Sequence, residues 1–497
     1  MSQVKIQNCA SITHTKRENG RKRIAICGAG IAGLTLAGIV SRRLQDEVRL
    51  SVFERAPVDR DQGYGLDLDK NGQEALARAG VYHRYWEISR PHSDSMALFP
   101  LKGSETLGVL FRRARMRRWL PSLFAARPET NRGALRDVLL EGVSKNKNTD
   151  VHFDTLVHDL IKTSGGIKLV SREDKPLGEY DLVVDAMGLH SPLRHYRVVD
   201  VEGGKQRTGA ILIHGVINDP DASDGPELKS RLQKFGSITA VGRGYIVAMQ
   251  RFGAGSEDNR TSFFYLLHHL SSESELFADI GIEPPDSRDT GIMRDERLDQ
   301  VKRWVKADMG DHFDPVWHSA VDSLDRVTIR DEITHGKTSL RENTTMPIVC
   351  IGDSLQHCGL GGGGNLAMRD ALELSKLLEK SAAFDDNRKP SLKMLHQAEV
   401  KMLRRKHEFA RDKHRLFGVY QQRVSALSRG VGSLEDWMQP GWALTLAKPA
   451  LAAFGSYTRR AYRQEVGTHG FLACDENTPI FPNVKSLLKK EEGKSES

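Results

Sequence analysis

The order of apolar and polar positions along this chain predicts two kinds of β-sheet. Mainly apolar runs at 24–27, 50–53, 178–184 and 348–351 are typical of buried parallel strands. The stretch 205–330 instead alternates and is rich in Ile, Val, Phe and Tyr, which predicts a mostly antiparallel sheet with one solvated or ligand-facing side. The predicted fold class is therefore α/β: a Rossmann-type domain on a parallel sheet, an interleaved, mostly antiparallel sheet domain and a C-terminal helical region.

The first apolar run opens a complete strand–turn–helix–strand unit within residues 23–55. Gly28, Gly30 and Gly33 follow the strand as G-x-G-x-x-G. The first glycine permits a tight turn, the second lets a pyrophosphate approach the backbone, and the third lets the helix pack closely on the strand. Glu54 lies 21 residues after Gly33, the interval at which an acid reaches a ribose hydroxyl. The unit predicts a dinucleotide site without a 2′-phosphate, and it does not separate NAD from FAD.

A second strand–loop–helix unit lies near residue 350. The apolar strand 348–351 ends at Gly352 and Asp353, a glycine-rich loop follows, and Asn365 opens a helix with apolar residues on one side. Glycines in such a loop let backbone N–H groups come close to a ligand. We expect this helix N-terminus to face a polar ligand, as the first one does.

Composition limits the partners and the cellular location. The chain has 497 residues, enough for two or three domains, and a mild net charge of +8 that could attract anionic cofactors or a membrane surface. Five cysteines without C-x-x-C spacing fit a reducing compartment and no structural metal, so a cytoplasmic location is predicted. No stretch is apolar enough to predict a membrane-spanning helix.

Two segments leave alternatives open. Residues 111–119 hold five arginines, which favours a solvated face or edge strand over a site for an anionic cosubstrate or membrane. Residues 437–457 are the most apolar C-terminal stretch, and Pro440 and Pro449 favour docking on the protein body. Peripheral membrane contact through an interfacial anchor, which would make the protein membrane-associated, is the alternative.

The predicted domains follow these changes of pattern, with a helix over 391–427. They are a flexible tail (1–20), the first part of the dinucleotide-binding domain (21–204, with an inserted substrate-domain segment at about 91–128), the substrate domain (205–330), the last part of the dinucleotide-binding domain (331–385), and a C-terminal helical region and tail (386–497).

The chain resembles the FAD monooxygenases of the para-hydroxybenzoate hydroxylase type, the single-component flavin-dependent aromatic hydroxylases. The resemblance covers roughly residues 21–420 and rests on GAGIAG with Glu54, Arg132 in R-x-x-L-R, DLVVDAMGLHSPLR and IGDSLQHCGLGGGGNLAMRDA. It implies that FAD is the cofactor. It also implies a role for each matching residue: Glu54 on the adenosine ribose, Arg132 on the phosphate region, Asp353 on the ribityl chain, Gly364 and Asn365 beside the isoalloxazine, and Gly65 on the mobile stretch around the flavin.

The same resemblance implies the activity. An FAD-dependent monooxygenase would take electrons from NAD(P)H and use O₂ to hydroxylate or epoxidise a small aromatic or polyketide/terpenoid-like substrate through a flavin hydroperoxide. No catalytic residue can be assigned from the sequence. Another flavin enzyme on the same scaffold (an oxidase, reductase, isomerase or cyclase) and a non-catalytic flavin-binding protein are the alternatives.

Two departures from the family pattern bear on this reading. Met187 stands where the family has an Asp, and Asp185 lies two residues earlier. The late motif is two residues shorter than usual, with Gln356 at the family's His position and His357 next to it. We expect FAD binding to be retained and reduction by NAD(P)H to be slow until substrate is bound.

Overall fold

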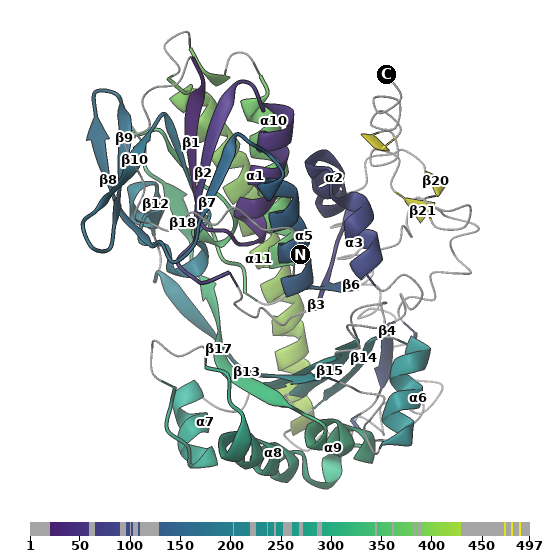
Figure 1. Cartoon of the computed structure of the whole chain (residues 1–497). Coiled ribbons are helices and arrows are strands. Elements are labelled where there is room, and N and C mark those ends of the chain that lie inside the picture. The colour runs from purple at the N-terminus through teal and green to yellow at the C-terminus, as the bar shows by residue number, and fades with distance from the viewer. Residues whose placement is uncertain are drawn as a thin grey trace.

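The structure is a computed structural model, and it divides into a part built on a parallel sheet and a part built on an antiparallel sheet (Figure 1). It describes residues 20–58, 65–89, 96–99, 101–102, 108–109, 129–201, 203–218, 225–235, 237–242, 245–251, 261–267, 272–285, 291–342, 345–359, 362–380, 383–385, 389–428, 472–473, 479–480 and 487–488.

A five-stranded sheet forms the centre of the first part, and every neighbouring pair of its strands is parallel. This confirms the Rossmann-type expectation. One predicted run was wrong in detail: residues 178–184 do not form one strand, because Asp181 separates the end of one strand from the start of another and accepts a hydrogen bond from the Arg23 N–H at 2.7 Å. The strand order is β19 (Ile348–Cys350), β11 (Leu182–Asp185), β1 (Lys22–Cys27), β2 (Val48–Phe53) and β7 (Thr149–His152).

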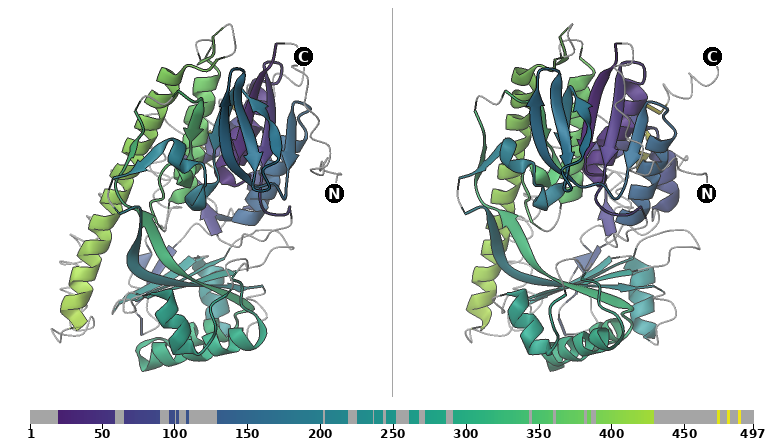
Figure 2. Two further views of the ribbon diagram at one scale, coloured as in Figure 1. Left: turned by 90° about the vertical axis from the view of Figure 1, so that its left-hand side faces the viewer. Right: turned by 60° about the vertical axis from the view of Figure 1, so that its left-hand side comes forward.

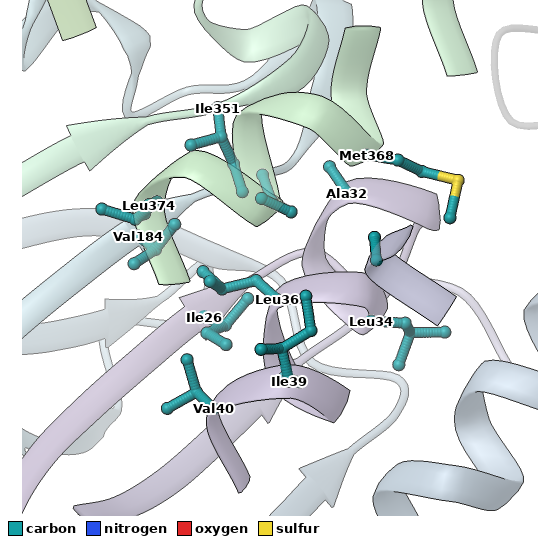
Figure 3. Close-up of a cluster of buried hydrophobic side chains, with 14 of the residues drawn as sticks. Ile26, Ala32, Leu34, Leu36, Ile39, Val40, Val184, Ile351, Met368 and Leu374 are labelled. Atoms are coloured by element: carbon teal, nitrogen blue, oxygen red, sulfur yellow. The ribbon is translucent and has the colours of Figure 1, made fainter. Parts of the chain in front are cut away.

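Two layers cover this sheet. Helices α1 (Ile31–Arg43), α5 (Arg132–Ser144) and α10 (Gly363–Leu378) lie on one face, where Ile26, Leu36, Val184, Ile351 and Leu374 meet in a single apolar cluster (Figure 3). A three-stranded antiparallel sheet covers the other face through a second cluster. Its strands are β8 (Val157–Thr163), β9 (Gly166–Ser171) and β10 (Pro176–Tyr180).

A seven-stranded sheet forms the second part. Its neighbouring strands are antiparallel except for the parallel pair β14 and β4, which agrees with the mostly antiparallel pattern predicted for 205–330. Helices lie on its far side from the parallel sheet (Figure 1). The strand order is β17 (Arg326–His335), β13 (Lys205–Ile217), β16 (Thr261–Leu267), β15 (Tyr245–Arg251), β14 (Ser237–Gly242), β4 (Met96–Phe99) and β5 (Gly108–Val109), and the helices are α6 (Pro226–Phe235), α7 (Glu273–Ile280), α8 (Asp295–Met309) and α9 (Pro315–Asp322).

Short elements and one long helix join the two parts. The predicted C-terminal helix is confirmed as α11 (Leu392–Ser428), which runs from the parallel-sheet part down past the seven-stranded sheet (Figure 2). Residues 111–119 and 437–457 lie outside the described residues. None of the described helices is long and apolar enough to cross a membrane. The other elements are β3 (Gly65–Asp67), α2 (Lys70–Ala79), α3 (Tyr82–Ile88), β6 (Glu129–Asn131), β12 (Val198–Asp200), β18 (Thr338–Leu340), β20 (Leu472–Ala473) and β21 (Pro479–Ile480).

Close backbone contacts fix where α1 begins. Gly28 has φ +108°, and a Cβ there would lie 2.5 Å from the carbonyl oxygen of Ala186 in the loop after β11. A Cβ on Gly33 would lie 1.9 Å from the carbonyl oxygen of Gly28. A Cβ on Gly30 would meet no heavy atom within 4 Å. The first and third glycines therefore serve packing, whereas the second borders open space.

Asp185 ends β11 and is completely buried. Its carboxylate accepts hydrogen bonds from the Ser191 hydroxyl at 2.6 Å and from the Met187 N–H at 3.1 Å. Burial raises the pKa of Asp185 from 3.8 to about 6, and these hydrogen bonds and the nearby Arg194 offset only part of that rise. The folded protein therefore binds a proton here in a pH range where the unfolded chain has released it.

Substitution of the two glycines tests the packing account. Gly33→Ala should lower the free energy of unfolding by about 1–3 kcal/mol or more, because a backbone atom that cannot move aside occupies the position of its Cβ. Gly30→Ala should cost less than about 1 kcal/mol, since its Cβ enters open space. Denaturant unfolding of the two variants measures the difference, and equal losses would contradict it.

Asp185→Asn tests the buried carboxylate. The wild type holds this proton up to about pH 6, whereas the unfolded chain loses it near 3.8, so the stability due to protonated Asp185 is lost as pH rises through that window. Relative to the Asn variant, the wild type should lose about 3 kcal/mol of unfolding free energy between about pH 3.5 and pH 7. Urea titrations at several pH values measure this, and a constant difference would contradict the raised pKa.

Candidate cofactor site

Two helix N-termini meet at the carboxyl edge of the parallel sheet. Helix α1 follows β1, and α10 follows the turn after β19. A Cβ built on Gly352 in that turn would lie 3.2 Å from the Cβ of Ala32 and 3.5 Å from the Cβ of Ala367, so the turn contacts both helices. Neither helix has a side-chain cap. Uncapped N–H groups and the helix dipoles therefore make this edge favourable for an anionic ligand.

Glu54 lies directly after β2, beside the glycine-rich turn. Its Oε2 accepts a hydrogen bond from the Ala29 N–H at 2.8 Å, and its Oε1 accepts one from the Ala56 N–H at 2.9 Å. These two bonds fix the carboxylate in direction, and each oxygen still has a lone pair for a further donor. The structure thus places Glu54 next to the loop that carries Gly28, Gly30 and Gly33, as the strand–turn–helix–strand pattern predicts.

Arg132 and Asp353 bring opposite charges to this edge from different elements. Arg132 is the first residue of α5, and its Nε is buried without a hydrogen-bond partner. Asp353 lies in the turn after β19, and its carboxylate is about one-third exposed. Burial alone would raise the pKa of Asp353, but His357, whose Nδ1 is 3.0 Å from Oδ2, together with Lys406 and Arg132, lowers it overall. Asp353 is therefore an anion with cations on several sides.

Gly364 and Asn365 lie at the start of α10 and contact the stretch of chain that follows Gly65. The Oδ1 of Asn365 accepts a hydrogen bond from the Asp69 N–H at 2.9 Å, and its Nδ2 donates one to the Asp67 carbonyl at 2.8 Å. A Cβ on Gly364 would lie 2.7 Å from the Cδ1 of Leu66. Strand β3, which begins at Gly65, is therefore held against the N-terminus of α10. The amide of Asn365 has this bridging role, which the sequence analysis missed.

The two departures from the family pattern have clear structural consequences. The side chain of Met187 packs against the apolar cluster under the β8–β10 sheet, and the carboxylate of Asp185 is buried among its own partners. Gln356 is buried. Its amide oxygen accepts a hydrogen bond from the Thr338 hydroxyl at 2.6 Å, and its amide nitrogen donates one to the His335 carbonyl at 3.1 Å. His357 is thus the histidine beside Asp353. Its spacing of four residues from Asp353 is a signal that the sequence analysis could have used.

Exposed cations surround the loop after β11. The Nδ1 of His190 lies 2.9 Å from the Nζ of Lys205. Partial burial lowers the pKa of His190, and the charges of Lys205, Arg55, His357 and Arg330 lower it further. These groups come from four segments far apart in sequence, and the sequence analysis did not predict that they gather.

No metal site adds to this arrangement in the part of the chain that the structure describes, where no group of three His, Cys, Asp or Glu side chains could hold an ion. A surface hollow of about 640 Å³ lies elsewhere, beside β12 and β18, and includes Tyr196 and Arg341. The chemistry available at the carboxyl edge is therefore that of an acidic acceptor, free N–H donors and a guanidinium. This set fits a diphosphate-linked dinucleotide such as FAD.

Comparisons with known proteins agree with this geometry. No family model matches the chain. It is 29% identical over 186 residues to the FAD-dependent monooxygenase nvfK of Aspergillus novofumigatus, a match that spans 37% of each chain. It is 24% identical over 382 residues to the FAD-dependent monooxygenase adrH of Penicillium rubens, a match that covers 75% of this chain and 72% of that one.

Solved structures share the whole fold. The HpxO protein of Klebsiella pneumoniae, solved with FAD and uric acid, superposes with a TM-score of 0.64 over 88% of this chain and 97% of that chain, at 17% sequence identity. That likeness establishes the fold, and the curated relatives share the class of enzyme. This chain is thus similar in sequence to curated FAD-dependent monooxygenases and shares its fold with the HpxO protein.

Proposed function

We propose that this chain binds FAD at the carboxyl edge of the parallel sheet and uses NAD(P)H and O₂ to hydroxylate or epoxidise a small aromatic or polyketide/terpenoid-like molecule. The observation that carries the proposal is the meeting of two uncapped helix N-termini with a fixed acidic acceptor, Glu54, at one edge. A protein that only needed a stable sheet would have no use for this arrangement. The shared fold with an FAD complex supports it.

The family resemblance suggests a role for each site residue, and the positions of these residues are compatible with those roles. Glu54 accepts hydrogen bonds from the adenosine ribose, and the open space at Gly30 admits the diphosphate, with Arg132 donating to it. Asp353 accepts hydrogen bonds from the ribityl chain. Gly364 and Asn365 would lie beside the isoalloxazine, and Asn365 would keep the stretch that begins at Gly65 close to it.

FAD, when bound and reduced, supplies the chemistry that activates O₂ for transfer of one oxygen atom to an electron-rich substrate. The side chains of this protein orient the reactants and exclude water. On the seven-stranded sheet, Leu212, Ile246, Phe264 and Leu266 form an apolar cluster separate from the core under the helices. His214 lies beside Phe264, and burial lowers its pKa to about 3, so it is uncharged near neutral pH. Arg330 lies opposite Leu212 on the same face, so this face supports a largely apolar substrate beside a cation.

An anionic cosubstrate fits the cations around the loop after β11. Arg55, Lys205 and Arg330 surround His190 and give that loop a positive surface, which would attract the diphosphate of NAD(P)H. The segment that ends β11 offers no carboxylate to this cosubstrate, because Met187 has only a weak thioether acceptor and Asp185 is buried. Reduction of the flavin would therefore depend on how closely the positive surface brings NAD(P)H, rather than on a hydrogen bond to Met187 or Asp185.

A non-catalytic flavin-binding protein is the second candidate, and the weak acceptor at Met187 is what favours it, because it weakens the reductive step. Consumption of O₂ with product carrying its oxygen distinguishes the two. Cytoplasmic location, and peripheral membrane contact through 437–457 as its alternative, stay predictions from the sequence.

Glu54→Ala tests the cofactor site. Loss of hydrogen bonds to a charged acceptor costs roughly 1.5–3 kcal/mol, so FAD should bind about tenfold or more weakly. Titration of the apoprotein with FAD, followed by quenching of flavin fluorescence, measures the dissociation constant. Glu47→Ala is the control, because its exposed carboxylate contacts only Lys22 among the contacts described. Unchanged affinity in Glu54→Ala would contradict the ribose assignment.

Met187→Asp tests the reductive step. A carboxylate at this position would provide a hydrogen-bond acceptor worth roughly 1–2 kcal/mol, so reduction by NAD(P)H without substrate should be about five- to thirtyfold faster. Stopped-flow absorbance under anaerobic conditions measures the rate, with Met187→Leu as the control for volume. If the wild type is already fast and Met187→Asp changes nothing, this position has no part in reduction.

A further inference from the structure

Helix α11 makes three contacts with the unit formed by β19, the turn that carries Asp353 and the start of α10. A separate stretch of chain lies between this unit and α11. The Oε1 of Glu399 accepts a hydrogen bond from the Cys350 N–H at 2.9 Å, at the end of β19. Lys406 pairs with Asp370 and interacts electrostatically with Asp353 in the turn after β19. Gly362 lies just before α10, and a Cβ built on it would be only 2.6 Å from the ring of Phe409. The helix thus backs the whole strand–turn–helix unit.

The middle contact is a buried cluster of charges. Asp370 on α10 has no exposed surface, and the side chain of Lys406 is only 1% exposed. The Oδ1 of Asp370 accepts a hydrogen bond from the Nη2 of Arg405 at 2.7 Å. Its Oδ2 lies 3.1 Å from the Nζ of Lys406 and accepts a hydrogen bond from the Gly352 N–H at 3.0 Å. One carboxylate oxygen thereby joins an ammonium group of α11 to the backbone of the turn.

That turn is the one that sets the direction of Asp353. Gly352 has φ +64°, and it begins the short 3-10 turn Gly352–Ser354. The other end of the turn is fixed by the Ser354 hydroxyl, which donates to the Asp185 carbonyl at 2.6 Å. The only polar side chain described on the Gly352 N–H is Asp370. A change in the charges around Asp370 therefore affects its hydrogen bond with Gly352, the residue next to Asp353.

We infer that Lys406 is a positioning residue of the cofactor site, which acts through Asp370 and Gly352 to hold Asp353 toward the ribityl chain of FAD. The inference rests on the proposed function, because it takes Asp353 as a ligand of the cofactor. Lys406 does not touch the cofactor in this account. Its ammonium group also contributes directly to the field at Asp353, alongside His357 from the same loop and Arg132 from α5.

A role in docking α11 alone is the competing explanation, and the helix offers a residue that separates the two. Glu399 is fully buried, pairs with Arg197 and anchors the same helix to β19, but it makes no contact with the Gly352–Ser354 turn among its described bonds. Loss of Glu399 should loosen the helix without reaching Asp353. Loss of Lys406 should reach Asp353 even where the helix remains in place.

The test compares Lys406→Met with Glu399→Gln and with Arg404→Met, whose side chain is 81% exposed and pairs only with Glu408 among the described contacts. FAD affinity of the full-length apoprotein is measured by fluorescence quenching from about pH 3 to pH 7, because the pKa of Asp353 is lowered from its usual 3.8. Lys406→Met should bind FAD about tenfold more weakly. Its affinity should also begin to fall at a higher pH than in the wild type, because Asp353 loses a neighbouring cation. Glu399→Gln should lower Tm with FAD affinity and pH profile unchanged, and Arg404→Met should change neither.

Each other outcome has a definite meaning. If Lys406→Met lowers Tm but leaves the FAD affinity and its pH profile unchanged, the lysine serves only helix docking and the inference is wrong. Asp353→Ala is measured in parallel: unchanged affinity in that variant would overturn the proposed site itself, whereas a loss there without a loss in Lys406→Met would overturn only the inference. If Lys406→Met does not fold, Lys406→Gln, which keeps a donor toward Asp370, takes its place. Failure of both to fold while Glu399→Gln folds would assign Lys406 to the fold and contradict the inference.

Discussion

The close approach of backbone to backbone at the carboxyl edge of the parallel sheet is the constraint on which the rest of this structure depends. A side chain at Gly28 would overlap the carbonyl of Ala186, and one at Gly33 would overlap the carbonyl of Gly28. Helix α1 can therefore begin directly above the ends of β1 and β11. Since the turn at Gly352 contacts both α1 and α10, the second helix begins at the same place. Two positive helix ends in one place are what make an anionic cofactor stable there.

Charges buried behind this edge connect it to the rest of the chain. Asp185, Asp370 and Glu399 are all without exposed surface, and each accepts hydrogen bonds from backbone N–H groups of the strands or turns that form the edge. A buried carboxylate costs free energy unless such partners satisfy it. The cations that balance these acids come largely from α11 and from the loop after β11. The geometry of the edge is thus sensitive to parts of the chain that do not contact the cofactor.

Most of what the sequence predicts comes from patterns within short stretches of the chain. The runs 24–27 and 348–351, the glycine spacing and the placement of Glu54 lie within a few residues of one another or at fixed intervals, so both strand–loop–helix units were predicted. Contacts across the chain leave no such pattern. The bridge from Asn365 to Asp67 and Asp69 joins residues almost 300 positions apart, and the cations around His190 come from four segments. The division of 178–184 into two strands depends on one polar residue, which apolar content alone does not reveal.

The visible absorption spectrum of the purified full-length protein, followed by anaerobic addition of NADPH, tests the central claim most directly. The account predicts the bands of oxidised flavin, release of that flavin as FAD on denaturation, and bleaching of the bands when NADPH is added together with a substrate. A colourless protein that takes up no FAD on titration, or a flavin that stays attached after denaturation, would contradict it.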